Sequence, residues 1–338
     1  MFKKWIMILC SVGITLYAIG CSAFLFILYG PIPNFREWLI TTAMGTMNHQ
    51  YYCKWFYSDE RIADVLNNNY IIEAEGETNP DLIDKNKNDH NYKDEYEREI
   101  LEHEDGELYK IIRFKVNGQN AYLAAVYDAS KISVGVTKYL GEAGQYVWQM
   151  AKYYNAKLAI NGGGFFDPNH NSNGGHPLGV TIANGKVITN EETGGSTSGI
   201  IGFNKDDVLI LKRSGSAHQL VAEGIRDAVT MGPFLIVNGK ASFIKGNGGW
   251  GYAARTAIGQ REDGVVLFLV VDSNVTRTKG ASMVDLTEIM QKYGAINAAN
   301  LDGGTSSVIA ENGELINDPI DSTGAHKSRG VPTIFMVK

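Results

Sequence analysis

The sequence predicts an α+β fold with a mixed, largely antiparallel sheet core, several hairpins and a few covering helices, preceded by one N-terminal transmembrane helix. Three observations predict it. An uncharged run occupies residues 5–29, Asn-Gly or Asp-Gly pairs separate apolar or alternating runs at five places after residue 108, and two stretches have helical periodicity. Such pairs favour two-residue hairpin turns, which join antiparallel strands. With 338 residues, the chain can bury one large core or two small ones.

The first segment, residues 1–30, is predicted to be a signal anchor. Its apolar run exceeds the roughly 20 residues that cross a bilayer, whereas a cleaved signal peptide usually has an apolar region of about 7 to 15 residues. Lys3 and Lys4 precede the run, so the N-terminus should be cytoplasmic and everything after Pro31 extracellular. The lipoprotein alternative at Cys21 is disfavoured because the apolar run continues past it. We therefore expect a single-pass protein of the cell membrane that contacts lipid through residues 5–29.

Residues 31–107 are predicted to be a juxtamembrane segment and an acidic spacer. Residues 36–57 are rich in aromatics and Met, which fits packing at the membrane surface or against the main domain, whereas residues 73–107 are strongly acidic and suggest a solvated spacer or an exposed helical segment. The net charge of −6 argues against nucleic acid as a partner. Cys53 is the only cysteine outside the apolar run, so no intrachain disulfide is expected there.

No cofactor is required by any motif, and Ca²⁺ is the one ion to consider. Residues 84–89 loosely suggest a calcium loop, but the glycine and the terminal glutamate of an EF-hand are missing from their places.

Residues 108–338 are predicted to form the main folded domain. One helix is expected over residues 142–154. A second is expected over residues 282–293, where Ser282 and Asp285 form a capping box and Gly294 ends the helix. The hairpin turns are expected at Asn117-Gly118, Asn184-Gly185, Asn238-Gly239, Asp263-Gly264 and Asn312-Gly313.

The densest motif is residues 300–307, where an apolar run ends in Asp302 and is followed by Gly303 and Gly304. Glycines remove the side chains that keep a ligand from the backbone. A second copy places Asn161 before Gly162 and Gly163. A tyrosine precedes the polar residue by seven positions in one copy and nine in the other, and a difference of two preserves the strand face. We therefore expect Asn161 and Asp302 to end neighbouring strands and to face one cleft; the alternative is that both glycine pairs are merely turns.

A hairpin should bring a cation to this region. If Asp263-Gly264 is a two-residue turn, Glu262 pairs with Val265, and counting outwards sets Arg255 directly opposite Asp272. The alternative is a structural ion pair, because buried arginines usually have carboxylate partners.

Four motifs in this order resemble the phosphodiester glycosidase family. They are residues 161–167, residues 255–259, residues 270–272 and residues 300–307, and the resemblance extends from about Ile111 to the C-terminus. The sequence departs from the family pattern at Thr305, where a third glycine is usual, and at Ser273, where a glycine commonly follows the aspartate. The resemblance implies that residues 108–338 are a phosphodiester glycosidase-like catalytic domain, which hydrolyses a sugar linked through a phosphodiester.

Such a reaction suggests roles for the motif residues. Cleavage at the sugar carbon builds positive charge, which calls for carboxylates beside it, and the departing phosphate needs cations or N–H groups. Asp302 and Asp272 are the candidate carboxylates and Arg255 the candidate phosphate clamp. The two aspartates cannot be divided into acid, base and nucleophile from sequence. The candidate substrate-binding residues, whose glycine amides would form an anion nest, are Asn161, Gly162, Gly163, Phe166, Asp167, Gly303, Gly304, Ser306 and Arg329.

The sequence therefore predicts a membrane-anchored extracellular glycosidase acting on a glycosyl-1-phosphodiester, with a cell-envelope glycopolymer such as an exopolysaccharide as the expected substrate. Two alternatives stay open. One is a metal-dependent phosphodiesterase in which Asp167, Asp272 and Asp302 hold a hard cation. The other is a non-catalytic envelope protein that binds or assembles glycan in the same cleft.

Overall fold

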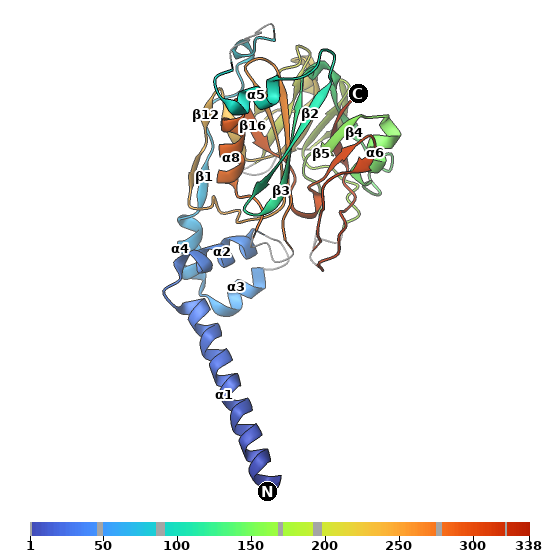
Figure 1. The fold of residues 1–338 in the computed structure, drawn as a ribbon. Helices are drawn as coiled ribbons and strands as arrows, with labels where there is room; N and C mark the ends of the chain where they lie inside the picture. The colour runs from blue at the N-terminus through green and yellow to red at the C-terminus, as the bar shows by residue number, and fades with distance from the viewer. Residues whose placement is uncertain are drawn as a thin grey trace.

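The computed structural model describes residues 2–45, 50–85, 92–167, 172–191, 198–274, 279–321 and 323–338. Helix α1 (Phe2–Tyr29) projects from the rest of the molecule, as Figure 1 shows. It is long and apolar enough to cross a membrane, and its side chains are exposed along almost the whole length of the helix. Its last turn differs, because Leu28 is only 3% exposed.

Three short helices connect α1 to the sheets (Figure 1). They are α2 (Pro33–Met44), α3 (Gln50–Phe56) and α4 (Asp59–Asn67), and we call them the juxtamembrane cluster. Ile40, Cys53 and Val65 form its core together with Leu28 of α1. The Tyr57 hydroxyl also donates to the Leu28 carbonyl at 3.1 Å. The C-terminal end of α1 is therefore part of this small core.

The acidic stretch is held against the domain at several points, and part of it is a helix with exposed residues, which is the second of the two structures that its charge suggests. Strand β1 (Tyr70–Ile72) pairs with β13 (Phe243–Lys245), and the stretch continues through the 3₁₀ turn η1 (Pro80–Leu82) and helix α5 (Glu95–Leu101). Ile100 of α5 is completely buried. Glu97 accepts a hydrogen bond of 2.9 Å from the Arg261 guanidinium, so a cation of the sheet holds this part of the acidic segment. Most of the calcium-like loop, residues 86–89, lies outside the described residues.

Three antiparallel sheets form the domain. The largest has the order β12-β11-β16-β14-β15-β3-β2, and the two others have the orders β18-β17-β5-β19-β4 and β7-β6-β10-β8-β9. The strands of the seven-stranded sheet are β2 (Tyr109–Val116), β3 (Gln119–Val126), β11 (Phe234–Val237), β12 (Lys240–Ala241), β14 (Arg255–Arg261), β15 (Val266–Val271) and β16 (Ala295–Asn300). Those of the second sheet are β4 (Ile132–Val136), β5 (Leu158–Asn161), β17 (Ile309–Glu311), β18 (Glu314–Leu315) and β19 (Thr333–Val337). Those of the third are β6 (Val180–Ala183), β7 (Lys186–Asn190), β8 (Gly199–Asn204), β9 (Leu209–Lys212) and β10 (Ile225–Met231).

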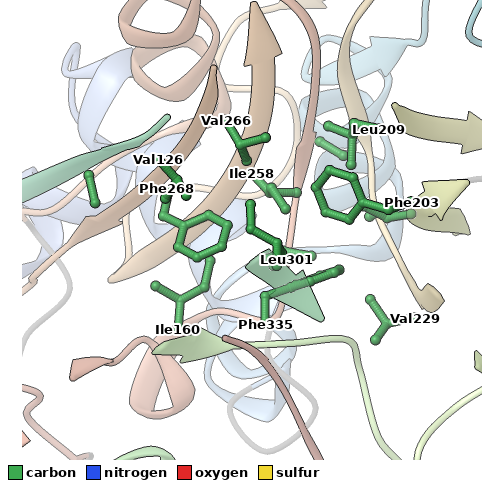
Figure 2. Packing of buried hydrophobic residues seen from close by; sticks show 14 of the residues in the cluster. Val126, Ile160, Phe203, Leu209, Val229, Ile258, Val266, Phe268, Leu301 and Phe335 are labelled. Carbon is green, nitrogen blue, oxygen red and sulfur yellow. The ribbon is translucent and has the colours of Figure 1, made fainter. Parts of the chain in front are cut away.

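The main core lies where the inner faces of these sheets meet. Figure 2 shows Phe268 of the first sheet, Ile160 and Phe335 of the second and Phe203 of the third converging on it around Leu301. Alternate residues of β15 point the other way and pack beneath helix α8 (Met283–Lys292), because strand side chains alternate between faces. Helices α6 (Val147–Tyr154) and α7 (Ala217–Ala222) cover the second and third sheets. The α+β prediction is confirmed.

The hairpin predictions are confirmed at the four Asn-Gly pairs. Each joins antiparallel strands, and both residues of each pair have positive φ. The Asp263-Gly264 prediction is wrong by one residue. The Arg261 amide donates to the Val265 carbonyl, and the register continues with Gln260 opposite Val266. The loop therefore has three residues, and it is closed by Asp263, whose carboxylate bonds both the Arg261 guanidinium and the Val265 amide.

The helix predictions are confirmed in part. Helix α8 has the expected N-cap Ser282 and capping box with Asp285, and Gly294 follows its end with a φ of +79°. Helix α6 begins at Val147, later than expected, because residues 142–146 are not helical and Gln145 forms an antiparallel bridge with Val331.

Candidate functional site

A cleft of about 570 Å³ lies at the ends of β14 and β16. Asp302 to Ser306, which follow β16, form one wall. The loop after β5 contributes Phe165 and Asp167, and the C-terminal loop contributes Lys327 and Arg329. The far wall comes from residues 250–255 and from Thr42 and Gly45 of the juxtamembrane cluster. Segments that are distant in sequence thus meet at one opening.

Two sheets hold the backbone of Asp302. Its amide donates to the Gly162 carbonyl at 3.2 Å, and its carbonyl accepts from Asn161 Nδ2 at 2.6 Å. The amide of the preceding Leu301 donates to the Thr256 carbonyl of β14 at 2.8 Å. Asp302 is therefore fixed between the end of β14 and the end of β5.

The carboxyl group of Asp302 has few partners. Oδ1 accepts from the Gly303 amide at 3.0 Å, whereas Oδ2 is buried and has no hydrogen-bond partner among the described residues. Burial raises the pKa of Asp302 to about 6, even though the nearby Ser306 hydroxyl and the charge of Arg329 act to lower it. A carboxyl group with a pKa near neutrality can gain or lose a proton under ordinary conditions, which is what an acid–base catalyst requires.

Arg255 reaches the cleft from the first residue of β14. Its Nη2 donates to the carbonyls of Trp250 and Gly251 at 2.7 and 3.1 Å, and its Nε donates to the Ala281 carbonyl at 3.2 Å. The remaining nitrogen lies beside the Asp302 loop, because a methyl group added at Gly303 would lie 3.6 Å from Nη1. The guanidinium plane is thus oriented by backbone carbonyls, which accept hydrogen bonds without neutralising its charge.

A second guanidinium enters from the C-terminal loop. Arg329 Nη1 donates to Asp167 Oδ2 at 2.6 Å, and the guanidinium lies over the Phe165 ring, 4.6 Å from its centroid. Burial alone would raise the pKa of Asp167, but the hydrogen bonds from Arg329 and Ser172 keep it below its ordinary value. Asp167 is therefore an anion that holds Arg329, whereas Asp302 is a carboxyl group that gains a proton much more readily.

Asn161 does not face the cleft. Its side chain is completely buried and bonds the Asp302 carbonyl, the Thr256 hydroxyl and the Val308 amide. β5 and β16 also belong to different sheets, so the expectation of neighbouring strands is wrong. The equivalence of the two motif copies fails because strands of facing sheets can meet at their ends without pairing.

The glycines after Asn161 serve packing. A Cβ at Gly162 would lie 2.6 Å from the Thr333 hydroxyl, and a Cβ at Gly163 would lie 2.8 Å from the Thr230 carbonyl. The amides of Gly162, Gly163 and Gly164 donate to Thr333 and Thr230, at 2.9 to 3.1 Å. They are already used within the fold, so the expected anion nest does not form there.

Around Asp302 the glycines are likewise bonded. The Gly303 amide donates to the Asp302 carboxylate, and the Gly304 amide donates to the Ala254 carbonyl at 2.8 Å. Gly304 has a φ of +64°, which turns the chain into the 3₁₀ turn η4 (Gly304–Ser306) and lines the cleft. Because these amides already have acceptors, the groups that can bind an anion at this site are the side-chain cations.

Asp272 lies apart from Arg255. Since Arg255 pairs with Val271, its side chain points to the α8 face of the sheet, and Asp272 points to the opposite face. Asp272 is 3% exposed and accepts from Asn317 Nδ2 at 2.8 Å and from the Asp318 amide at 3.3 Å. Burial raises its pKa, and the bonds from Asn317 and Asp318 oppose that rise. Asp272 is not among the described cleft residues, so the expected register pair is wrong; the one-residue shift of the loop reverses the face.

Of the remaining predicted residues, one lies in the cleft and one does not. Ser306 lines the cleft beside Asp302, whereas the Phe166 side chain is 58% exposed and lies outside the described lining. Several lining residues were not predicted from the sequence, among them Trp250 and Tyr252, and Asn300 had been given no role although it begins the motif of residues 300–307. The signal for Asn300 was present, because it precedes Asp302 by two positions and such residues share a strand face.

Asn300 carries a buried acceptor. Its Nδ2 donates to the Gly232 carbonyl at 2.8 Å, which fixes the orientation of the amide because a carbonyl can only accept. Its Oδ1 has no hydrogen-bond partner among the described residues, although the side chain is only 1% exposed. The cleft therefore contains at least two buried oxygens, on Asn300 and Asp302, that a ligand can satisfy.

Across the described residues, no three His, Cys, Asp or Glu side chains gather closely enough to hold a metal ion. The trio of aspartates suggested for a cation is separated, since Asp272 points away and Asp167 is bound to Arg329.

The region that contains this site is similar to known proteins. The family model described as phosphodiester glycosidase matches residues 154–338, more than half of the chain. An uncharacterized prophage-derived protein YomE of Bacillus subtilis is 28% identical over 203 residues, 58% of this chain and 30% of that protein. Human N-acetylglucosamine-1-phosphodiester alpha-N-acetylglucosaminidase is 24% identical over 191 residues, 52% of this chain and 36% of the human protein. The chain thus spans about a third of the length of these curated relatives.

A solved structure has a related fold. The zebrafish N-acetylglucosamine-1-phosphodiester alpha-N-acetylglucosaminidase catalytic domain, auto-inhibited by its pro-peptide, superposes with a TM-score of 0.56 at 22% identity, covering 70% of this chain and 85% of that one. Asp302, Arg255, Asp167 and Arg329 all lie within the residues matched by the family model. The chain belongs to the phosphodiester glycosidase family.

Proposed function

We propose that this protein is a membrane-anchored extracellular glycosidase that hydrolyses the bond between a sugar and phosphate in a glycosyl-1-phosphodiester. The observation that carries the proposal is the Asp302 carboxyl group, in a cleft that also contains Arg255 and Arg329. One of its oxygens is buried and has no hydrogen-bond partner in the part of the chain that the structure describes, and its pKa is raised. Membership of the phosphodiester glycosidase family supports it. The mammalian relatives are named for this reaction on N-acetylglucosamine-1-phosphodiester.

The two guanidinium groups suit the leaving group. When the anomeric C–O bond breaks, the electron pair goes to a phosphate oxygen, and a phosphate monoester leaves with increased negative charge. Arg255 and Arg329 supply planar donors that match phosphate oxygens. The carbonyls that hold Arg255 are uncharged, so they orient the guanidinium toward the departing phosphate without neutralising it.

Asp302 would act on the water. A phosphate monoester is a good leaving group and needs cations more than a proton, so the carboxylate is of most use on the opposite, electron-poor side of the sugar. Ionised Asp302 would stabilise the oxocarbenium-like transition state and take a proton from the attacking water. Activity should then require the ionised form and fall as the pH drops below about 6.

The sugar would be recognised by its hydrogen-bond donors. Asn300 Oδ1 can only accept, so its partner must be a hydroxyl or an acylamino N–H on the sugar. Trp250 and Tyr252 offer aromatic surface on the same cleft, which suits the apolar face of a sugar ring. Asp272 would have a positioning role, holding residues 317 and 318.

The location is part of the proposal. The last turn of α1 belongs to the core of the juxtamembrane cluster, so cleavage after this turn would remove Leu28 from a packed interior. This supports a retained anchor. With Lys3 and Lys4 on the cytoplasmic side, the cleft lies outside the cell, where a cell-envelope glycopolymer is the expected substrate.

The test uses the full chain in lipid nanodiscs with α- and β-linked glycosyl-1-phosphodiesters in ¹⁸O-labelled water, with and without calcium. We expect ¹⁸O in the released sugar, loss of release in Asp302→Asn, and a fall in kcat/KM below about pH 6. Appearance of ¹⁸O in phosphate would identify a phosphodiesterase instead. Saturable glycan binding without release under any condition would favour a binding protein, and a rate that falls above pH 6 would make Asp302 a general acid.

A further inference from the structure

The Arg255 guanidinium is held by a loop that precedes its strand. Two of its hydrogen bonds, at 2.7 and 3.1 Å, go to the carbonyls of Trp250 and Gly251. Any displacement of these carbonyls changes the direction in which the guanidinium points. The position of Arg255 in the cleft therefore depends on residues 246–252, which form most of the connection between β13 and β14.

This loop is rich in glycine and needs external support. Gly246, Gly248, Gly249 and Gly251 all have positive φ, a conformation that glycine adopts without strain but that it does not prefer over others. The loop also lies between two strands of different sheets. Its conformation must therefore be selected by neighbouring groups.

The juxtamembrane cluster and its connection to β1 supply that support. Asn247 Nδ2 donates to the Thr41 hydroxyl of α2 at 2.7 Å, and the Asn247 amide donates to Asn69 Oδ1 at 2.9 Å. Thr42 packs directly on Gly251, since a Cβ added at Gly251 would lie 2.4 Å from the Thr42 hydroxyl oxygen. Thr41 is completely buried at this contact.

The same helix also reaches the cleft itself. Thr42 and Gly45 line it, and the Thr42 hydroxyl is buried with no hydrogen-bond partner among the described residues. The family model matches residues 154–338, so Thr42 and Gly45 lie outside the matched region.

We propose that the juxtamembrane cluster is a working part of the active site: through Thr41, Thr42 and Asn247 it positions the Arg255 guanidinium for the phosphate group of the substrate. The inference rests on the proposed function, in which Arg255 holds the departing phosphate. Thr41 and Asn247 are positioning residues that act through another side chain. A displacement of about 1 Å at a substrate-orienting group can cost as much as 100-fold in rate, so a weakened contact should be measurable.

The experiment compares Thr41→Val with Thr41→Ser in the full chain in nanodiscs. Valine keeps the volume of threonine but cannot accept from Asn247, whereas serine keeps the acceptor. Thr287→Val is the matched control, because Thr287 is also a buried helical threonine but bonds only the Met283 carbonyl of its own helix. Asn247→Ala tests the same contact from the loop side if Thr41→Val fails to fold.

We expect Thr41→Val and Asn247→Ala to lower kcat/KM by about tenfold, mostly through KM, and Thr41→Ser to restore it. In an Arg255→Lys background, Thr41→Val should have little further effect, because coupled residues are not additive. Hydrogen exchange should be faster at the amides of Asn247 and Gly249, and the affinity for inorganic phosphate should fall. Thr287→Val should change none of these.

Equal losses in the wild-type and Arg255→Lys backgrounds would overturn the proposal, and so would faster exchange in the loop with unchanged phosphate affinity. If the wild-type chain cleaves no glycosyl phosphodiester, the proposed function fails. Phosphate affinity and hydrogen exchange still decide whether the juxtamembrane cluster positions Arg255, because neither depends on turnover.

Discussion

Replacing Asp302 by asparagine removes a charge that the fold disfavours while it keeps the shape of the side chain. Burial raises the pKa of Asp302 from 3.8 to about 6. Two units at about 1.36 kcal/mol each correspond to about 3 kcal/mol of stability. Because the folded state binds this proton more tightly than the unfolded state, stability falls as the pH rises from about 4 to 6, and the whole loss is present above pH 6.

An asparagine side chain at this position would carry no charge at any pH, so Asp302→Asn should be more stable than the wild type at pH 7 by up to about 3 kcal/mol, or roughly 5 to 10 °C in Tm. The difference should shrink toward pH 4, where Asp302 is itself neutral. Turnover should fall by at least about 100-fold, which makes this a site where activity opposes stability. Thermal unfolding of both proteins in one detergent from pH 4 to 8 measures the difference. A difference that does not change with pH would refute this account of the Asp302 environment.

Three further substitutions test the roles of Asp272, Gly163 and Arg329. Asp272→Asn should have the opposite effect on stability and lower it by about 1 to 3 kcal/mol, because an amide N–H would face the Asn317 and Asp318 donors; an increase in Tm would contradict the assigned hydrogen bonds. Gly163→Ala should also lower stability by about 1 to 3 kcal/mol, since its Cβ would lie 2.8 Å from the Thr230 carbonyl. The folded fraction should bind phosphate normally. A selective loss of phosphate binding would instead show that the amide of Gly163 belongs to an anion-binding nest. Arg329→Lys should raise KM by about tenfold, because an ammonium group cannot bridge Asp167 and a phosphate with planar paired donors; an unchanged KM in steady-state kinetics would remove Arg329 from phosphate binding.

Local sequence predicted local structure well and long-range geometry less well. The four Asn-Gly hairpins were predictable because asparagine and glycine tolerate the positive φ that the turn demands. The Asp263-Gly264 hairpin was not, because Asp263 bonds the Arg261 guanidinium and the Val265 amide and the loop takes one more residue. That single residue turned Asp272 to the opposite face from Arg255. A strand register that is counted from a turn is correct only if the length of the turn is correct.

The candidate site was predictable as a set of motifs and not as an arrangement. Asp302, Arg255, Asp167 and Arg329 do line one cleft. Asn161 does not, because a polar residue at a strand end serves equally well as a ligand group or as a hydrogen-bonding support, and sequence alone does not distinguish the two. The contacts of the acidic segment with the domain were not predictable for a related reason: the cation that Glu97 binds is Arg261, 164 positions away in the chain.

The arrangement around Asp302 explains why so many buried polar groups surround it without bonding its free oxygen. Asn161 and Gly162 fix the backbone of Asp302 from the second sheet, and Thr256 fixes Leu301 from the first, so the carboxyl group is placed mainly through the backbone, and the Gly303 amide bonds its Oδ1 and leaves Oδ2 open. A donor placed on Oδ2 would have stabilised the anion and lowered the pKa toward its ordinary value. The position of the side chain and its proton affinity are therefore set by different residues. A substitution such as Asn161→Ala should displace the carboxyl group, whereas a new donor beside Oδ2 would leave it in place and remove its ability to exchange a proton near neutral pH.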